Sequence, residues 1–344
     1  MFLSRLAAAA ALAIGLSMSS TAVFAEAVTI RYSNWLPPNF FLWDKALKPW
    51  IDEIERVTEG RVKVEVLPKV VGTTASQFDV VRDGLADMAF MVSSYTPGRF
   101  VLTEFGELPL LSSDASTIAP AFDRLYRKHL ERYDEFKGVK ILSICTISPS
   151  QLFTARKQIK TIHDIKGLKL RSPTSGTTAF LENLGGVAIN KPSTEAFEML
   201  ATGTIDGQMT QANTVVGFGQ TDLTRFALLL PGGASNAVNM VAINPDKWAE
   251  IAPADQEAIM AISAEKLAAT VGAAYSKAED AANARLKEAG YVVEEASPEM
   301  VAELREKLKP IEQAWIERAK AKGLANPEEI LAEYRAAISA GKSD

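Results

Sequence analysis

An arginine at the end of an apolar strand is the residue in this sequence best placed to bind a ligand. Residues 167–171 read Gly-Leu-Lys-Leu-Arg and are followed by Pro173 and a polar turn. In a parallel α/β sheet the carboxyl ends of the strands face the ligand cleft, so Arg171 is expected there. Its guanidinium stays charged and presents two parallel donors that match a carboxylate. A surface salt bridge is the alternative, and the residues alone leave the two equally open.

Polar and aromatic residues follow two earlier predicted strands, at 28–33 and 88–92. They would form the opposite wall of the cleft, with rings for stacking and with hydrogen-bonding groups. These candidates are Asn34, Trp35, Ser93, Ser94 and Tyr95. Asn213 and Asn236 are weaker candidates, because either could merely cap a turn.

The sequence shows no catalytic machinery. His129 and His163 lie in no metal-binding or catalytic spacing, and no phosphate-binding loop is present. Cys145 lies in an apolar strand and is expected to be an inert core thiol. We therefore expect no catalytic residue, no metal and no cofactor. With 37 Lys+Arg against 42 Asp+Glu the net charge is -5, which argues against a nucleic-acid partner.

The first 25 residues have the pattern of a cleaved secretory signal. A single arginine precedes an apolar run, and Val23-Phe24-Ala25 suits signal peptidase. The apolar run is shorter than the roughly 20 residues that span a membrane. An exported, periplasmic protein is therefore expected.

The mature chain predicts an α/β fold with two lobes. Strand, helix and strand follow one another within residues 28–66, which indicates a parallel sheet. The phrase Gly84-x-x-Asp87 at a helix exit recurs as Gly203-x-x-Asp206, as two similarly built lobes would require, although chance recurrence is the alternative.

The chain is expected to cross between the lobes more than once, which makes a hinge rather than a linker. Residues 26–146 would form most of lobe I, 147–231 would form lobe II, and 232–252 would return to complete lobe I. Residues 253–344 would then supply a long helix, 253–289, lying across both lobes, and further C-terminal helices.

The sequence closely resembles the extracytoplasmic solute-binding proteins of tripartite ATP-independent periplasmic (TRAP) transporters. The resemblance rests on four segments, namely 164–173, 203–208, 95–100 and 107–109. It implies a periplasmic-binding-protein fold that closes around a small organic acid, with Arg171 holding the carboxylate. It also implies the small and large permease subunits as partners, and we expect a monomer.

Three departures from that family concern the ligand. Thr210 and Gln151 are further candidate binding residues: Thr210 stands where many relatives have an asparagine, and Gln151 where relatives that bind sugar acids have a second arginine. Val92 stands where those same relatives have a glutamate. The pocket is thus less polar, which favours a monocarboxylate with an apolar or aromatic body, such as a 2-oxo or hydroxy acid. The alternatives are a binding protein for an ATP-driven importer or signalling receptor, and an exported enzyme acting on an organic acid.

Overall fold

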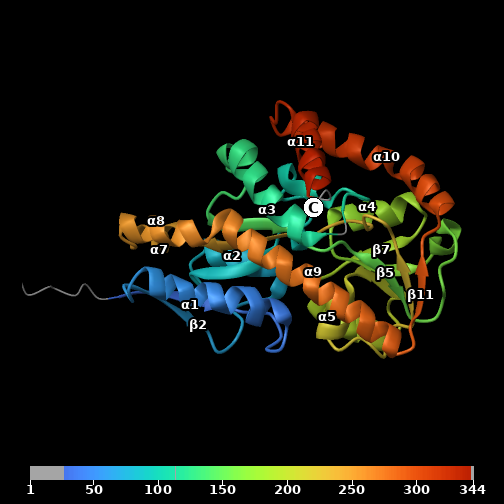
Figure 1. Cartoon of the computed structure of the whole chain (residues 1–344), viewed down its shortest axis with the longest axis horizontal. Coiled ribbons are helices and arrows are strands. Elements are labelled where there is room, and N and C mark those ends of the chain that lie inside the picture. The colour runs from blue at the N-terminus through green and yellow to red at the C-terminus, as the bar shows by residue number, and fades with distance from the viewer. Residues whose placement is uncertain (1–26, 113, 342–344) are drawn as a thin grey trace, which may run out of the picture.

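The computed structural model describes residues 27–112 and 114–341, which form two α/β lobes (Figure 1). The predicted signal segment, 1–25, lies outside the described residues. The α/β, two-lobed prediction is confirmed, because each lobe is built on its own mixed sheet.

Lobe I contains a five-stranded sheet in the order β2-β1-β3-β10-β4. β1 runs parallel to β2 and β3, whereas β10 runs antiparallel to β3 and β4. Its strands are β1 (Val28–Ser33), β2 (Val62–Val66), β3 (Met88–Val92), β4 (Lys140–Thr146) and β10 (Val238–Ile243).

Lobe II contains a six-stranded sheet in the order β11-β9-β5-β8-β6-β7. β6 runs parallel to β7 and β8, and β11, which the sequence patterns did not predict, adds a parallel edge strand beside β9. Its strands are β5 (Gln151–Thr154), β6 (Lys169–Ser172), β7 (Val187–Asn190), β8 (Gly207–Thr210), β9 (Phe226–Leu229) and β11 (Val292–Glu295).

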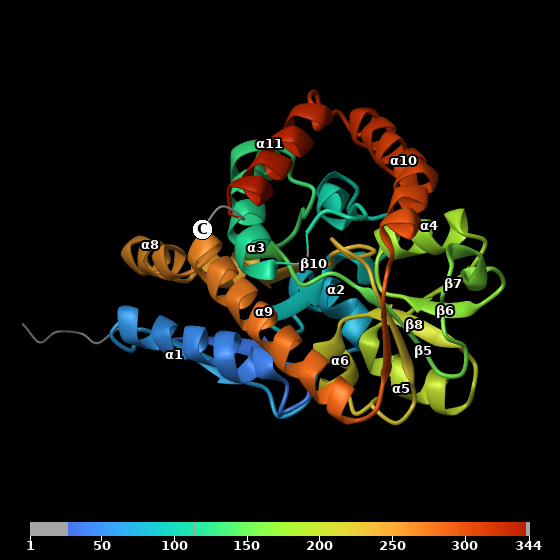
Figure 2. The ribbon, with the colours of Figure 1, turned by 45° about the vertical axis from the view of Figure 1, so that its right-hand side comes forward.

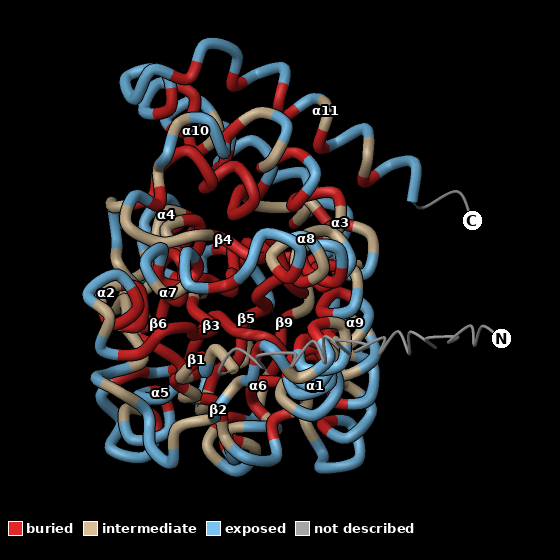
Figure 3. Tube along the Cα trace, turned by 90° about the vertical axis from the view of Figure 1, so that its left-hand side faces the viewer, coloured by how far each residue is buried: buried red, intermediate tan, exposed pale blue. Residues whose placement is uncertain are grey.

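Helices cover both sheets, and α9 contacts α3 of lobe I and α6 of lobe II (Figure 2). The α-helices are α1 (Lys48–Val57), α2 (Gln77–Arg82), α3 (Ala115–Leu125), α4 (Ser175–Asn183), α5 (Ser193–Ala201), α6 (Ala212–Gly217), α7 (Pro245–Ala249), α8 (Pro253–Ile262), α9 (Ala264–Glu288), α10 (Pro298–Ala321) and α11 (Pro327–Ala340). Buried residues concentrate in the strands and on the inner faces of the helices (Figure 3).

The long helix predicted over 253–289 is in fact two helices. The break lies at Ser263, and Ala264 takes a left-handed backbone conformation with φ of 46°. The Ser263 hydroxyl accepts a hydrogen bond from Trp50 Nε1 at 3.1 Å and donates one to the Ile259 carbonyl at 2.7 Å. The contact with a residue 213 positions earlier accompanies a break that helical periodicity does not reveal.

The repeated Gly-x-x-Asp phrase has the same structural role in both lobes. Asp87 accepts a hydrogen bond from the Arg31 backbone N–H at 2.8 Å and returns one to its carbonyl at 2.9 Å. Asp206 does the same with Lys169, at 2.8 and 2.7 Å. Each aspartate precedes a strand, β3 or β8, and thereby holds the start of that strand against a neighbouring one, β1 or β6. In lobe II the neighbouring strand is β6, which carries Arg171.

Two chain segments that join the lobes pair with each other. Ser150 N–H donates to the Ser235 carbonyl at 2.7 Å, and Ile147 N–H donates to Ala237 at 3.1 Å. Gly233 has φ of 71°, and a Cβ there would lie 2.0 Å from the Pro149 side chain. Glycine is therefore required where the two segments meet.

Candidate functional site

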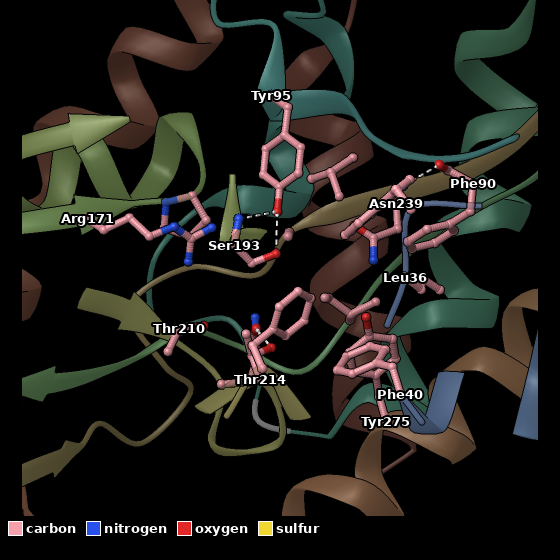
Figure 4. A pocket seen from close by; sticks show the side chains of 17 residues that line it. Leu36, Phe40, Phe90, Tyr95, Arg171, Ser193, Thr210, Thr214, Asn239 and Tyr275 are labelled. Atoms are coloured by element: carbon pink, nitrogen blue, oxygen red, sulfur yellow. Dashed lines mark hydrogen bonds between the residues drawn. The ribbon is translucent and has the colours of Figure 1, made fainter. Parts of the chain in front are cut away.

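A cavity lies between the lobes (Figure 4). Lobe I supplies residues from the loop after β1, from β3 and β10, and from α9. Lobe II supplies residues that follow or belong to β6, β8, α5 and α6. The lining consists of Trp35, Leu36, Phe40, Phe90, Val92, Tyr95, Ile147, Arg171, Pro173, Ser193, Thr210, Gln211, Thr214, Phe218, Ala237, Asn239 and Tyr275.

Arg171 is the one charged residue among the described residues that line this cavity. Its backbone pairs with Ile189 of β7 and Gln208 of β8, and the residue is 1% exposed. Nε donates to the Lys191 carbonyl at 2.7 Å, and no carboxylate of the described chain forms an ion pair with it. A buried guanidinium without an anion is costly, so this geometry favours an anion from outside.

The surroundings of Arg171 shift the pKa of its guanidinium in opposite directions. Burial lowers the pKa of the guanidinium, whereas Tyr95 and Glu195 raise it. Arginine nevertheless stays protonated in proteins, so the site retains a positive charge. The Tyr95 hydroxyl also reaches lobe II, where it lies 3.2 Å from Ser193 Oγ and accepts a hydrogen bond from the Ser193 backbone N–H at 3.2 Å.

Aromatic rings form much of the remaining wall. Trp35 donates its Nε1–H to the Phe90 carbonyl at 2.8 Å and stacks on the Phe90 ring, with centroids 5.7 Å apart. Phe40 of lobe I meets Phe218 of lobe II edge to face, with centroids 5.3 Å apart. Rings of this kind favour the flat apolar body of an aromatic ligand.

Four of the residues predicted from sequence line the cavity, namely Trp35, Tyr95, Arg171 and Thr210. The predicted residues of lobe I that do not line it have partners elsewhere. Asn34 Oδ1 accepts from the Leu36 backbone N–H at 3.1 Å and so caps its own turn. Ser93 donates to the Val238 carbonyl at 3.2 Å, and Ser94 donates to Glu107.

Three further predicted residues also lie outside the lining. Gln151 exchanges hydrogen bonds with the Leu230 backbone, at 2.7 and 3.3 Å. Asn213 donates to Glu279. Asn236 donates to the Ile147 carbonyl at 2.7 Å and to the Ser112 carbonyl at 3.2 Å, which ties together the segments between the lobes. Their amides serve the fold at the hinge and on α6 rather than facing the cavity.

The sequence patterns missed several lining residues. Asn239 is a polar residue inside the apolar strand β10, and this contrast was an available signal. Tyr275 belongs to the apolar stripe of α9 and could not be told from an ordinary core residue. Ser193 is the first residue of α5. It lines the cavity because the two lobes pack against each other there, which no local sequence pattern shows.

Other groups in the described chain offer little chemistry. No three His, Cys, Asp or Glu residues in ranges 27–112 and 114–341 lie close enough to hold a metal ion. Cys145 is buried, and burial raises the pKa of its thiol. No helix in the described part is both long and apolar enough to cross a membrane.

Comparison with known proteins finds one family and several close structures. Residues 34–318 match the model of DctP, bacterial extracellular solute-binding protein, family 7. A TRAP periplasmic solute-binding protein from Bordetella bronchiseptica, with bound (R)- and (S)-mandelate, is 36% identical, with a TM-score of 0.88 over 91% of this chain and 99% of that one.

Two further structures are similar over nearly the whole chain. A TRAP solute-binding protein from Rhodoferax ferrireducens, in complex with copurified benzoate, is 26% identical, with a TM-score of 0.85 over 92% of this chain and 98% of that one. A TRAP solute-binding protein from an unidentified microbe of a marine metagenome, in complex with 3-hydroxybenzoate, is 25% identical, with a TM-score of 0.84 over 92% and 99%.

Proposed function

Because this chain belongs to the family 7 extracellular solute-binding proteins, which serve TRAP transporters, we propose that it captures a small aromatic monocarboxylate and delivers it to a TRAP permease. In this proposal Arg171 holds the carboxylate, and the aromatic wall holds the body of the ligand. The family consists of receptors rather than enzymes, and the acid would be released unchanged.

The buried, unpaired guanidinium of Arg171 is the observation that carries this proposal. Nε is bound to the Lys191 carbonyl, and no carboxylate of the described residues forms an ion pair with the guanidinium, so its terminal nitrogens can take a ligand carboxylate. A carboxylate placed there would accept charge-assisted hydrogen bonds and would neutralise the cation. The Tyr95 hydroxyl, already at the lobe interface, is a further donor close to the same charge.

The rest of the lining favours one carboxylate and an apolar body. No second cation lines the described cavity, so a second carboxylate would be buried without a partner. Gln151, at the position where the family resemblance implies an arginine in sugar-acid binders, is bonded to the Leu230 backbone and does not line the cavity. The similar proteins hold mandelate, benzoate and 3-hydroxybenzoate, which are all aromatic monocarboxylates.

Contacts between the lobes suggest how binding would be signalled. Tyr95 of lobe I and Ser193 of lobe II meet in the cavity wall, and Thr194 Oγ1 lies 3.2 Å from Thr74 Oγ1. A ligand that touches both lobes binds the closed form more tightly and shifts the population towards it. We propose that the small and large permease subunits recognise this closed, monomeric form in the periplasm.

A ligand screen by thermal shift, followed by calorimetry, tests this function. We expect stabilisation by benzoate-like acids and none by succinate or by sugar acids. Arg171→Lys should weaken binding roughly 10- to 100-fold, because it keeps the charge but loses the paired donors, and Arg171→Met should weaken it further. Arg99→Lys, at an ion pair outside the cavity, is the control. Stabilisation by dicarboxylates alone, or full affinity in Arg171→Met, would refute the proposal.

A further inference from the structure

Asn239 places an unsatisfied hydrogen-bond acceptor in the cavity wall. The residue is 1% exposed, and its Oδ1 has no hydrogen-bond partner among the described residues. Asn239 lies on β10 between Val92 of β3 and Cys145 of β4. Ala237, two positions earlier and hence on the same side of the chain, also lines the cavity.

A second polar group lies beside this amide. Burial raises the pKa of Tyr275 well above its usual value, so its hydroxyl stays protonated, and the Asn239 amide opposes that shift. Tyr275 therefore presents a protonated hydroxyl near Asn239, whose Oδ1 has no hydrogen-bond partner among the described residues.

The other residues near this end of the cavity have little to offer that oxygen. Leu36, Phe90, Val92 and Ile147 line the cavity with apolar side chains. Native proteins seldom leave a buried acceptor unpaired, and such a group usually indicates a role. A donor carried by the ligand would pair it.

Arg171 and Asn239 therefore offer polar groups at two separate places in the cavity wall. Figure 4 shows Arg171 on one side, Asn239 and Tyr275 on the other, and Tyr95 and Ser193 between them. A hydroxyl next to a carboxylate would remain close to Arg171. A hydroxyl on the far part of an aromatic ring would instead approach Asn239.

We propose that the ligand is a ring-hydroxylated aromatic monocarboxylate whose phenolic O–H donates to Asn239 Oδ1 while its carboxylate lies on Arg171. This inference rests on the function proposed above and makes Asn239 the residue that determines specificity. The ligand hydroxyl is meta or para to the carboxylate-bearing position, and its oxygen can also accept from Tyr275.

Calorimetry with benzoate, 3- and 4-hydroxybenzoate, their methoxy analogues and mandelate tests the inference. In the unaltered protein we expect at least one hydroxybenzoate to bind roughly 10-fold or more tightly than benzoate, as a buried hydrogen bond implies. The methoxy analogues cannot donate and should show no such gain. Asn239→Leu, similar in size, should remove the preference, measured as the ratio of the benzoate and hydroxybenzoate dissociation constants.

Tyr275→Phe keeps the ring in the core and is the second variant, should Asn239→Leu fold poorly. It should reduce the hydroxybenzoate preference, measured as the same ratio of dissociation constants. Benzoate binding with no preference for a hydroxyl in the unaltered protein, or a preference that survives both variants, would overturn this inference alone. If none of these acids bound, the proposed function would fail with it.

Discussion

Gly217→Ala should weaken ligand binding by blocking closure of the lobes. Gly217 is the last residue of α6 in lobe II, and Phe40 of lobe I packs directly against it. A Cβ at Gly217 would lie 2.6 and 2.8 Å from two carbons of the Phe40 ring. Because these residues belong to different lobes, the clash would arise only when the lobes meet.

The size of the effect follows from that distance. Carbon atoms in contact prefer about 3.5–4.0 Å, so the ring and the glycine must separate by roughly 1 Å. Overpacking of this kind costs about 1–3 kcal/mol. At 1.4 kcal/mol for each tenfold change, affinity should fall between about 5- and 100-fold. Alanine is the better helix former, so the ligand-free protein should unfold at an unchanged or slightly higher temperature.

Calorimetry with the best acid, together with small-angle scattering, measures this effect. We expect weaker binding and a smaller ligand-induced decrease in the radius of gyration. In a Phe40→Ala background the same substitution should have little further effect, because the clashing ring is gone. Unchanged affinity and unchanged compaction in Gly217→Ala would refute the closure reasoning.

Three further predictions concern single side chains. Tyr95→Phe removes the hydroxyl that contacts Ser193 and should weaken ligand binding by roughly 3- to 10-fold in calorimetry. The unfolding temperature of the ligand-free protein should not change. Full affinity in this variant would exclude Tyr95 from closure of the lobes. Burial raises the pKa of Glu107 from 4.5 to about 8, so its carboxyl is protonated when folded and ionised when unfolded between these values. The contribution of Glu107 to folding stability is thus full below about pH 4.5 and is lost by about pH 8. Glu107→Gln should therefore reduce the fall of the unfolding temperature between pH 5 and 8.5. Parallel curves of unfolding temperature against pH for the variant and the unaltered protein would contradict this. The buried Cys145 thiol, with its raised pKa, should react with a thiol reagent at pH 7.5 only after denaturant is added, so rapid reaction of the folded protein would contradict its burial.

The sequence predicted the parts of the fold that depend on local pattern. The first strand of lobe I, strand β6 of lobe II, the repeated Gly-x-x-Asp phrase and the position of Arg171 at a carboxyl strand end all follow from short-range rules. The break at Ser263 does not, because its contact with Trp50 comes from a distant part of the chain. The edge strand β11 likewise depends on pairing with β9 rather than on its own short sequence.

Within the site, sequence indicated the right strand ends but not the side-chain directions. Trp35 and Tyr95 line the cavity, whereas Ser94, adjacent to Tyr95, is bonded to the buried Glu107. Whether a polar side chain faces the cavity depends on which partner the tertiary structure brings to it. For the same reason Asn239, inside an apolar strand, lines the cavity while Asn236 binds the segments between the lobes.

A crystal structure of the protein with the aromatic acid that binds most tightly tests the central claim most directly. We expect both carboxylate oxygens within hydrogen-bonding distance of the terminal nitrogens of Arg171, with the ring between Trp35 and Phe218 and the lobes closed. An acid bound elsewhere, with no carboxylate on the terminal nitrogens of Arg171, would contradict the account.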